Sequence, residues 1–203
     1  KTGRPIYAYY AQTAASGALY ISMAADKIYT NRNTWTGSIG VIVSLTNYKK
    51  LYDKLGIKEI DITSGKNKSM GSGGLDLTDE QYDILQSLVD EAYDQFAGIV
   101  SEGRGIDIAT VKKIADGRIY SAKQAKEKKL VDEIGTEDEL KALIQKENNL
   151  SDDVVYDTAK SSGSNFLSNL MGSVQKIMPK SDSELAVDII ENKGKGVLMY
   201  YAD

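Results

Sequence analysis

Short apolar runs alternate with helical periodicities along most of this chain of 203 residues. Residues 5–10 (PIYAYY) and 27–30 (KIYT) are rich in β-branched and aromatic side chains, which predicts buried strands. Between them, residues 18–26 are mostly small and apolar, so we expect a helix that lies close against a sheet. Strands that alternate with helices are typical of a layered α/β fold with a largely parallel sheet, and we predict that fold class.

The other elements are predicted from apolar spacing, glycines and helix caps. Further strands are expected at residues 39–45, 58–63 and 131–134. Further helices are expected at residues 48–55, 78–103, 108–114, 121–129 and 136–146. The helix from Thr78 is the clearest, because Thr78 and Gln81 have the spacing of a capping box. Residues 12–17 are expected to form a turn, and residues 64–77 a loop rich in Gly, Ser and Lys.

The composition changes after Leu150, where a linker-like stretch is followed by an apolar helical stripe and an apolar tail. We therefore expect one α/β domain over residues 1–150 and an appendage of linker, helices and tail over residues 151–203. The formal net charge of −4 argues against nucleic acid as a partner.

The chain contains no His and no Cys. A Ser-His-Asp site, thiol catalysis, disulfides and thiolate metal sites are therefore excluded within this chain. Any metal site would need oxygen ligands only, and covalent catalysis would need Ser, Thr, Lys or a carboxylate.

Ser16 lies between a predicted strand and a predicted helix. This placement exposes a side-chain oxygen at the carboxyl edge of a sheet, beside backbone N–H groups that can hold an oxyanion. Serine is also a common N-cap residue, so Ser16 could simply cap the helix.

A serine nucleophile in this chain needs a base other than histidine, and an uncharged lysine amine has the right chemistry. The reference pKa of lysine, about 10.4, must fall by roughly 3 units for that role near neutral pH, and burial can lower it. Lys66 and Lys68 are the candidates, in the loop after the strand at 58–63. Either could instead be a solvated loop cation.

Several ordered motifs resemble the signal peptide peptidase A family, the Ser/Lys-dyad peptidases of bacteria. They are residues 13–28 (TAASGALYISMAADKI), 36–42 (TGSIGVI), 62–68 (ITSGKNK), 103–105 (GRG), 112–120 (KKIADGRIY) and 125–135. The resemblance covers residues 5–144 and implies a crotonase/Clp-protease-like fold of repeated ββα units, with the catalytic domain at residues 1–150. Because the family's lysine loop has the form S-G-x-x-K, it selects Lys68 over Lys66.

The resemblance also implies roles for individual residues. Ser16 corresponds to the nucleophile and Lys68 to the general base. Ser38 corresponds to the hydroxyl that orients the lysine, although it could be an ordinary turn serine, and the Gly17 N–H is an expected oxyanion donor. The family needs no cofactor, forms ring-like homo-oligomers and cleaves remnant signal peptides and other apolar, small-residue peptides at the membrane, with the catalytic domain on the extracytoplasmic side.

This sequence departs from the family pattern in two respects. Ala18 adds a methyl group where the family usually has Gly. The family's membrane anchor and a Gly-rich loop that gives an oxyanion donor precede the nucleophile segment, whereas only 15 residues precede Ser16 here. We therefore expect that the chain lacks the N-terminal part of the family fold, which was removed or is a separate chain.

Two other functions remain open from the sequence. One is a crotonase-like acyl-CoA enzyme, and the other is a catalytically silent oligomeric scaffold. The apolar tail at residues 197–202 looks like a substrate stretch, which raises the hypothesis that it occupies a peptide groove.

Overall fold

The computed structural model describes residues 3–157, so the predicted helices and tail at the C-terminal end lie outside the described residues. The strands are β1 (Tyr7–Tyr10), β2 (Thr13–Ala15), β3 (Lys27–Thr30), β4 (Trp35–Gly37), β5 (Ile119–Ser121) and β6 (Glu133–Ile134). The helices are α1 (Gly17–Ser22), α2 (Lys49–Leu55), α3 (Asp79–Arg104), α4 (Ile108–Ile114), α5 (Ala122–Glu127) and α6 (Glu137–Glu147). The predicted alternation of strands and helices is therefore confirmed.

The strands form two three-stranded sheets, in the orders β1-β3-β6 and β2-β4-β5. All neighbours are parallel except β4 and β5, which confirms the largely parallel arrangement. β2 lies inside residues 12–17, so the prediction of a turn throughout that segment was wrong. The crotonase/Clp-protease-like arrangement of ββα units stays a prediction.

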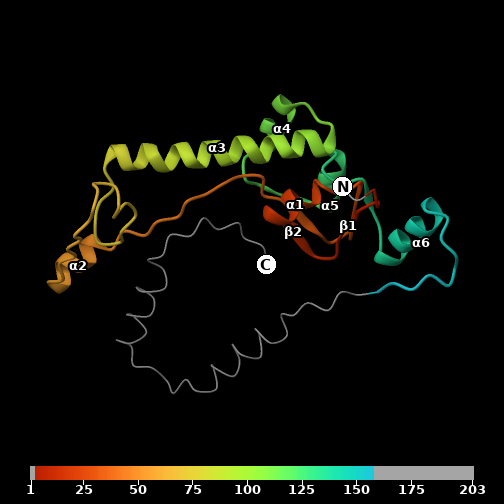
Figure 1. The fold of residues 1–203 in the computed structure, drawn as a ribbon, viewed down its shortest axis with the longest axis horizontal. Helices are drawn as coiled ribbons and strands as arrows, with labels where there is room; N and C mark the ends of the chain where they lie inside the picture. The colour runs from red at the N-terminus through yellow and green to blue at the C-terminus, as the bar shows by residue number, and fades with distance from the viewer. Residues whose placement is uncertain (1–2, 158–203) are drawn as a thin grey trace, which may run out of the picture.

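The core joins α1, the sheets and the C-terminal half of α3. Leu19 of α1, Ile28 of β3 and Val100 of α3 are fully buried. The ring of Tyr20 contacts Phe96 edge to face, with 5.2 Å between the ring centres. Figure 1 shows α1, β1 and β2 beside one end of the long α3, and α2 beyond its other end.

Residues 41–78 form an extension that leaves the sheets and reaches the N-terminal end of α3 (Figure 1). The strands predicted at residues 39–45 and 58–63 are wrong for the structure, because neither segment pairs with another strand of the described chain. Ile39 is buried in the core, but the alternating apolar side chains of residues 58–63 have no sheet to cover, and Ile60 and Ile62 are 72% and 99% exposed.

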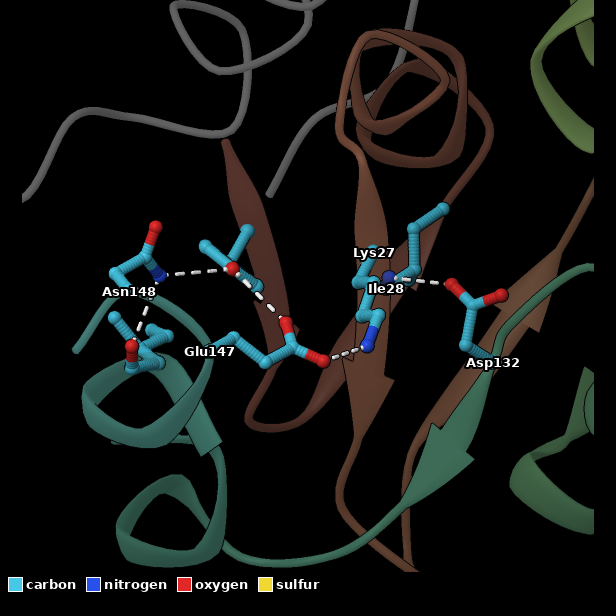
Figure 2. Close-up of polar contacts among 7 residues, drawn as sticks. Lys27, Ile28, Asp132, Glu147 and Asn148 are labelled. Carbon is cyan, nitrogen blue, oxygen red and sulfur yellow. Dashed lines mark hydrogen bonds and ion pairs between the residues drawn. The ribbon is translucent and has the colours of Figure 1, made fainter. Parts of the chain in front are cut away.

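The C-terminal end of α6 is fixed to β1 and β3 by polar contacts (Figure 2). Glu147 forms an ion pair with Lys27 and accepts a hydrogen bond of 3.0 Å from the Tyr7 hydroxyl. Asn148 Nδ2 donates to the Tyr7 hydroxyl at 3.1 Å and to the Ile144 carbonyl at 2.9 Å. These contacts place the end of the described α/β region against its first strands.

An ion pair between the buried Arg104 and the half-buried Asp132 connects the C-terminal end of α3 to β3. The Arg104 guanidinium donates to both carboxylate oxygens of Asp132, at 2.6 and 3.1 Å, and to the Lys129 carbonyl at 2.7 Å. The Ile28 N–H donates to Asp132 at 2.7 Å. Burial pushes the pKa of Asp132 upward, but the hydrogen bonds from Arg104 and Ile28 outweigh it and lower the pKa below its ordinary value.

None of the helices within residues 3–157 is both long enough and apolar enough to cross a membrane.

Candidate active site

Ser16 occupies a strained turn between β2 and α1. Its φ of 52° and ψ of −113° fall in a region that glycine adopts easily and other residues adopt at a cost of about 1–3 kcal/mol. The Ser16 N–H is held by the Gly37 carbonyl at 2.8 Å. A strained strand-to-helix turn of this kind presents the nucleophilic serine in α/β-hydrolases.

The Ser16 side chain makes no capping hydrogen bond to α1. An N-cap serine normally accepts one from the first turn of its helix, and that contact is why serine is favoured there. The capping interpretation of Ser16 therefore lacks its physical basis in this structure, and the strain at Ser16 is not explained by a side-chain cap.

Ser38 lies beside Ser16. β2 and β4 are parallel and pair Ala15 with Gly37, so the two serines follow the carboxyl ends of adjacent strands at the same level. Strands in a sheet are about 4.8 Å apart, which makes these serines immediate neighbours. Ser38 also has a positive φ of 51°, and its N–H donates to the Arg118 carbonyl at 2.8 Å.

Gly37 sets the backbone between the two serines, and we expect Gly37→Ala to destabilise the protein. Gly37 has a φ of +87°, and an added Cβ would lie 2.7 Å from the Tyr120 ring and 2.8 Å from the Arg118 carbonyl oxygen. We expect a loss of about 2–3 kcal/mol in unfolding free energy, from clash and backbone strain together. Gly56→Ala is the matched control, since Gly56 has a φ of +68° but no atom within 4 Å of the added Cβ. Urea unfolding compares the two, and an equal loss in both variants would contradict the close packing at Gly37.

Gly17 is the first residue of α1. The first N–H groups of a helix have no acceptor within the helix, so the Gly17 N–H is compatible with the predicted role of oxyanion donor. Within residues 3–157, no group of three or more acidic side chains is arranged to hold a metal ion.

Lys68 lies in the loop before α3, in an exposed position. It lines an open pocket whose other residues are Leu45, Tyr48, Tyr52, Ile57, Glu59, Asp61 and residues 69–73. Lys66 is engaged elsewhere, in an ion pair of 2.7 Å with Glu80 of α3. The side chain of Lys68 has no ion pair in the part of the chain that the structure describes.

The structure brings Ser16 and Ser38 together but keeps Lys68 away from both. The loop with Lys68 is bound to Glu80 at the start of α3, whereas α1 packs near Phe96 (Figure 1). At roughly 1.5 Å of rise per residue, Glu80 and Phe96 lie about 24 Å apart along the helix. An extended lysine side chain spans about 6 Å, so Ser16 and Lys68 of one chain do not meet in this conformation.

The sequence profile of peptidase family S49 matches residues 1–151 of this chain. The chain belongs to peptidase family S49. This assignment covers every motif used in the sequence analysis and makes the chain part of a peptidase.

Named relatives agree with the assignment to family S49. The chain is 42% identical to a protein of Enterococcus faecium assigned as a signal peptide peptidase, SppA, over 83% of this chain and 48% of the relative. It is 35% identical to protease 4 of Haemophilus influenzae, over 67% of this chain and 22% of the relative. It is 31% identical to the chloroplastic serine protease SPPA of Arabidopsis thaliana, over 65% of this chain and 20% of the relative. The S49 chain spans about half the length of the first of these relatives.

Proposed function

We propose that this S49 chain carries both members of a Ser/Lys dyad in a serine endopeptidase, with Ser16 as nucleophile and Lys68 as general base. The observation that carries the proposal is the strained, uncapped turn at Ser16, directly beside Ser38. Strained backbone conformations of non-glycine residues are typical of active sites. The α/β region at residues 1–150 is then the catalytic part of the chain.

The reaction needs an uncharged amine and an oxyanion donor. Lys68 removes the Ser16 proton as Oγ attacks the scissile carbonyl carbon, and the Gly17 N–H stabilises the oxyanion. The C–N bond then breaks, and protonated Lys68 gives its proton to the departing amine. In the second half of the reaction, Lys68 takes a proton from a water molecule as that water attacks the acyl ester carbon. The bond from the carbonyl carbon to Ser16 Oγ then breaks, protonated Lys68 returns the proton to Oγ, and the new carboxyl terminus is released. The Ser38 hydroxyl accepts a hydrogen bond from the Lys68 amine, and this contact orients the nitrogen lone pair of Lys68 toward Ser16.

Because Ser16 and Lys68 of one chain lie at different ends of α3, we propose that each dyad forms between two copies. The extension that carries Lys68 exposes Ile57, Ile60 and Ile62, apolar surface that association of copies would cover. Docking would also remove Lys68 from water, which favours the uncharged form of an amine. A ring-like homo-oligomer provides this arrangement at every subunit boundary.

The proposed substrates are remnant signal peptides and other apolar, small-residue peptides, cleaved at the extracytoplasmic face of the membrane. The name of the Enterococcus faecium relative refers to signal peptides, and that relative is the most extensively matched of the three described above. The open pocket that includes Lys68 is lined partly by Leu45 and Ile57, which suits an apolar peptide side chain. No cofactor enters the proposed reaction.

A serine-directed acylating probe on the full-length protein tests this proposal. We expect mass spectrometry to find the label on Ser16, and we expect Ser16→Ala and Lys68→Ala each to lower peptide turnover by about 10³-fold or more. Ser87→Ala is the matched control, because its hydroxyl only donates to the Ile84 carbonyl of its own helix.

The outcomes of this experiment separate the dyad from its rivals. Peptide turnover that survives Ser16→Ala would overturn the dyad, since another group would then be the nucleophile, and a full-length protein that binds acyl-CoA without any peptide turnover would favour the acyl-CoA enzyme. A full-length protein with no probe labelling and no peptide turnover would favour the silent scaffold.

A further inference from the structure

We propose that Glu80 and Gln81, in the first turn of α3, are positioning residues for Lys68. This inference rests on the proposed function, since it assigns them the task of holding the loop that carries the base. The lysine loop is defined here as residues 64–77. Glu80 and Gln81 contact that loop immediately before Lys68, and neither touches Ser16.

Gln81 connects the N-terminal end of α3 to the backbone of the lysine loop. Its side chain accepts from the Thr78 N–H at 3.2 Å, and the Thr78 hydroxyl accepts from the Gln81 N–H at 3.2 Å, which completes the capping box. The Gln81 amide also donates to the Lys66 carbonyl at 3.4 Å. Gln81 is only 8% exposed, so its side chain is fixed in the one orientation that serves both contacts.

Glu80 holds the side chains of the same loop. One of its carboxylate oxygens pairs with Lys66 Nζ at 2.7 Å, and the other accepts from Asn67 Nδ2 at 3.5 Å. The hydrogen bond from Lys66 is the main reason that the pKa of Glu80 lies below its ordinary value. Glu80 therefore stays charged well below neutral pH and keeps its hold on Lys66.

The contacts of Glu80 and Gln81 place the two lysines in different environments. Lys66 is bound to α3, while Lys68 lies two residues beyond the carbonyl that Gln81 holds and its side chain is exposed. The structure thus gives a physical reason why Lys68 is the available base. It also assigns Lys66 a role that the sequence motif alone did not indicate.

The expected signature of a positioning role is a loss of rate without a loss of stability. Exposed ion pairs add little to folding stability, so breaking the pair of Glu80 and Lys66 has little effect on the melting temperature. A general base misplaced by about 1 Å lowers the rate by as much as 10²-fold. A purely structural contact would change stability and rate together.

Steady-state kinetics on the full-length protein test this inference. We expect Glu80→Ala to lower kcat about 10-fold or more, with KM and the melting temperature nearly unchanged, and the acylation rate of Ser16 by a small probe to fall equally. Asp94→Asn is the matched control, because Asp94 is also in α3 and the change breaks its exposed ion pair of 2.7 Å with Lys112 of α4. The charge-swapped double variant Lys66→Glu with Glu80→Lys re-forms the pair, and we expect it to recover most of the lost rate.

Three results would overturn the inference. They are a kcat of Glu80→Ala no lower than that of Asp94→Asn, a melting temperature that falls in proportion to kcat, and no recovery in the charge-swapped variant. Failure of the proposed function looks different, because Lys68→Ala would then retain full turnover whatever Glu80 does.

Discussion

An assembly that mixes equal amounts of Ser16→Ala and Lys68→Ala subunits is expected to regain about one quarter of wild-type activity. Half of the subunits provide an intact Ser16 at their boundary, and in half of those cases the neighbouring subunit provides an intact Lys68. Each variant alone is expected to be inactive. The recovery follows from the structure, in which α3 separates the two residues by far more than a lysine side chain can span. A dyad completed within one chain would give no recovery, since neither subunit carries both residues.

This experiment is best done by co-expression of the two variants with different affinity tags, followed by purification on both tags in turn. Peptide turnover per subunit is then compared with that of wild-type protein treated in the same way. Lys68→Ala mixed with a Ser16→Ala, Lys68→Ala double variant is the control, because no boundary in that mixture has an intact lysine. Activity no higher than in this control would show that one chain supplies both residues after a rearrangement.

Replacement of Arg104 by Leu is expected to destabilise the fold by about 1–3 kcal/mol, because it leaves the half-buried carboxylate of Asp132 without its partner. The Arg104 side chain is only 8% exposed and Asp132 is 34% exposed, so water cannot replace the lost hydrogen bonds fully. Lys112→Met breaks an exposed ion pair with Asp94 and is expected to leave the stability nearly unchanged. Urea unfolding of the three proteins at neutral pH gives the comparison, and equal losses in both variants would contradict the special role of Arg104.

The cost of losing Arg104 is also expected to depend on pH. The folded-state pKa of Asp132 is lowered, so this carboxylate adds stability above its ordinary pKa of about 3.9 and loses that contribution as the pH falls through the lowered value. The difference between wild type and Arg104→Leu is therefore expected to narrow in acid. A difference that stays constant between neutral pH and pH of about 2–3 would show that the destabilisation comes from lost packing instead of lost charge pairing.

The helices were predictable from sequence because their signals are local. Thr78 and Gln81 form the expected capping box, and Gly105 ends α3 with a φ of +61°. The strands β2, β4 and β5 were missed because each has only three residues, too few for an alternating pattern. The segment at residues 58–63 has a strong strand pattern, but pairing depends on a neighbouring strand that the local sequence does not encode.

The candidate site was predictable in part. The position of Ser16 between a strand and a helix could be inferred from the residues on either side of it in the sequence. The turn that contains Gly37 and Ser38 could be inferred in the same way. The register that pairs Ala15 with Gly37 and so aligns Ser16 with Ser38 depends on contacts between segments, which no local pattern specifies. The distance between Ser16 and Lys68 depends on the direction of α3, and Glu80 was recognised only as part of a helix start.

The length and continuity of α3 have a consequence for how activity would respond to dilution. In the proposed assembly, the N-terminal end of this helix supports the loop of the base Lys68 and its C-terminal end lies near the turn of the nucleophile Ser16, so a separated subunit would hold two incomplete halves and hydrolyse nothing. Turnover would then rise more steeply than in proportion to protein concentration until the particles are fully assembled. Stray peptidase activity from lone subunits would be suppressed without any inhibitor or propeptide.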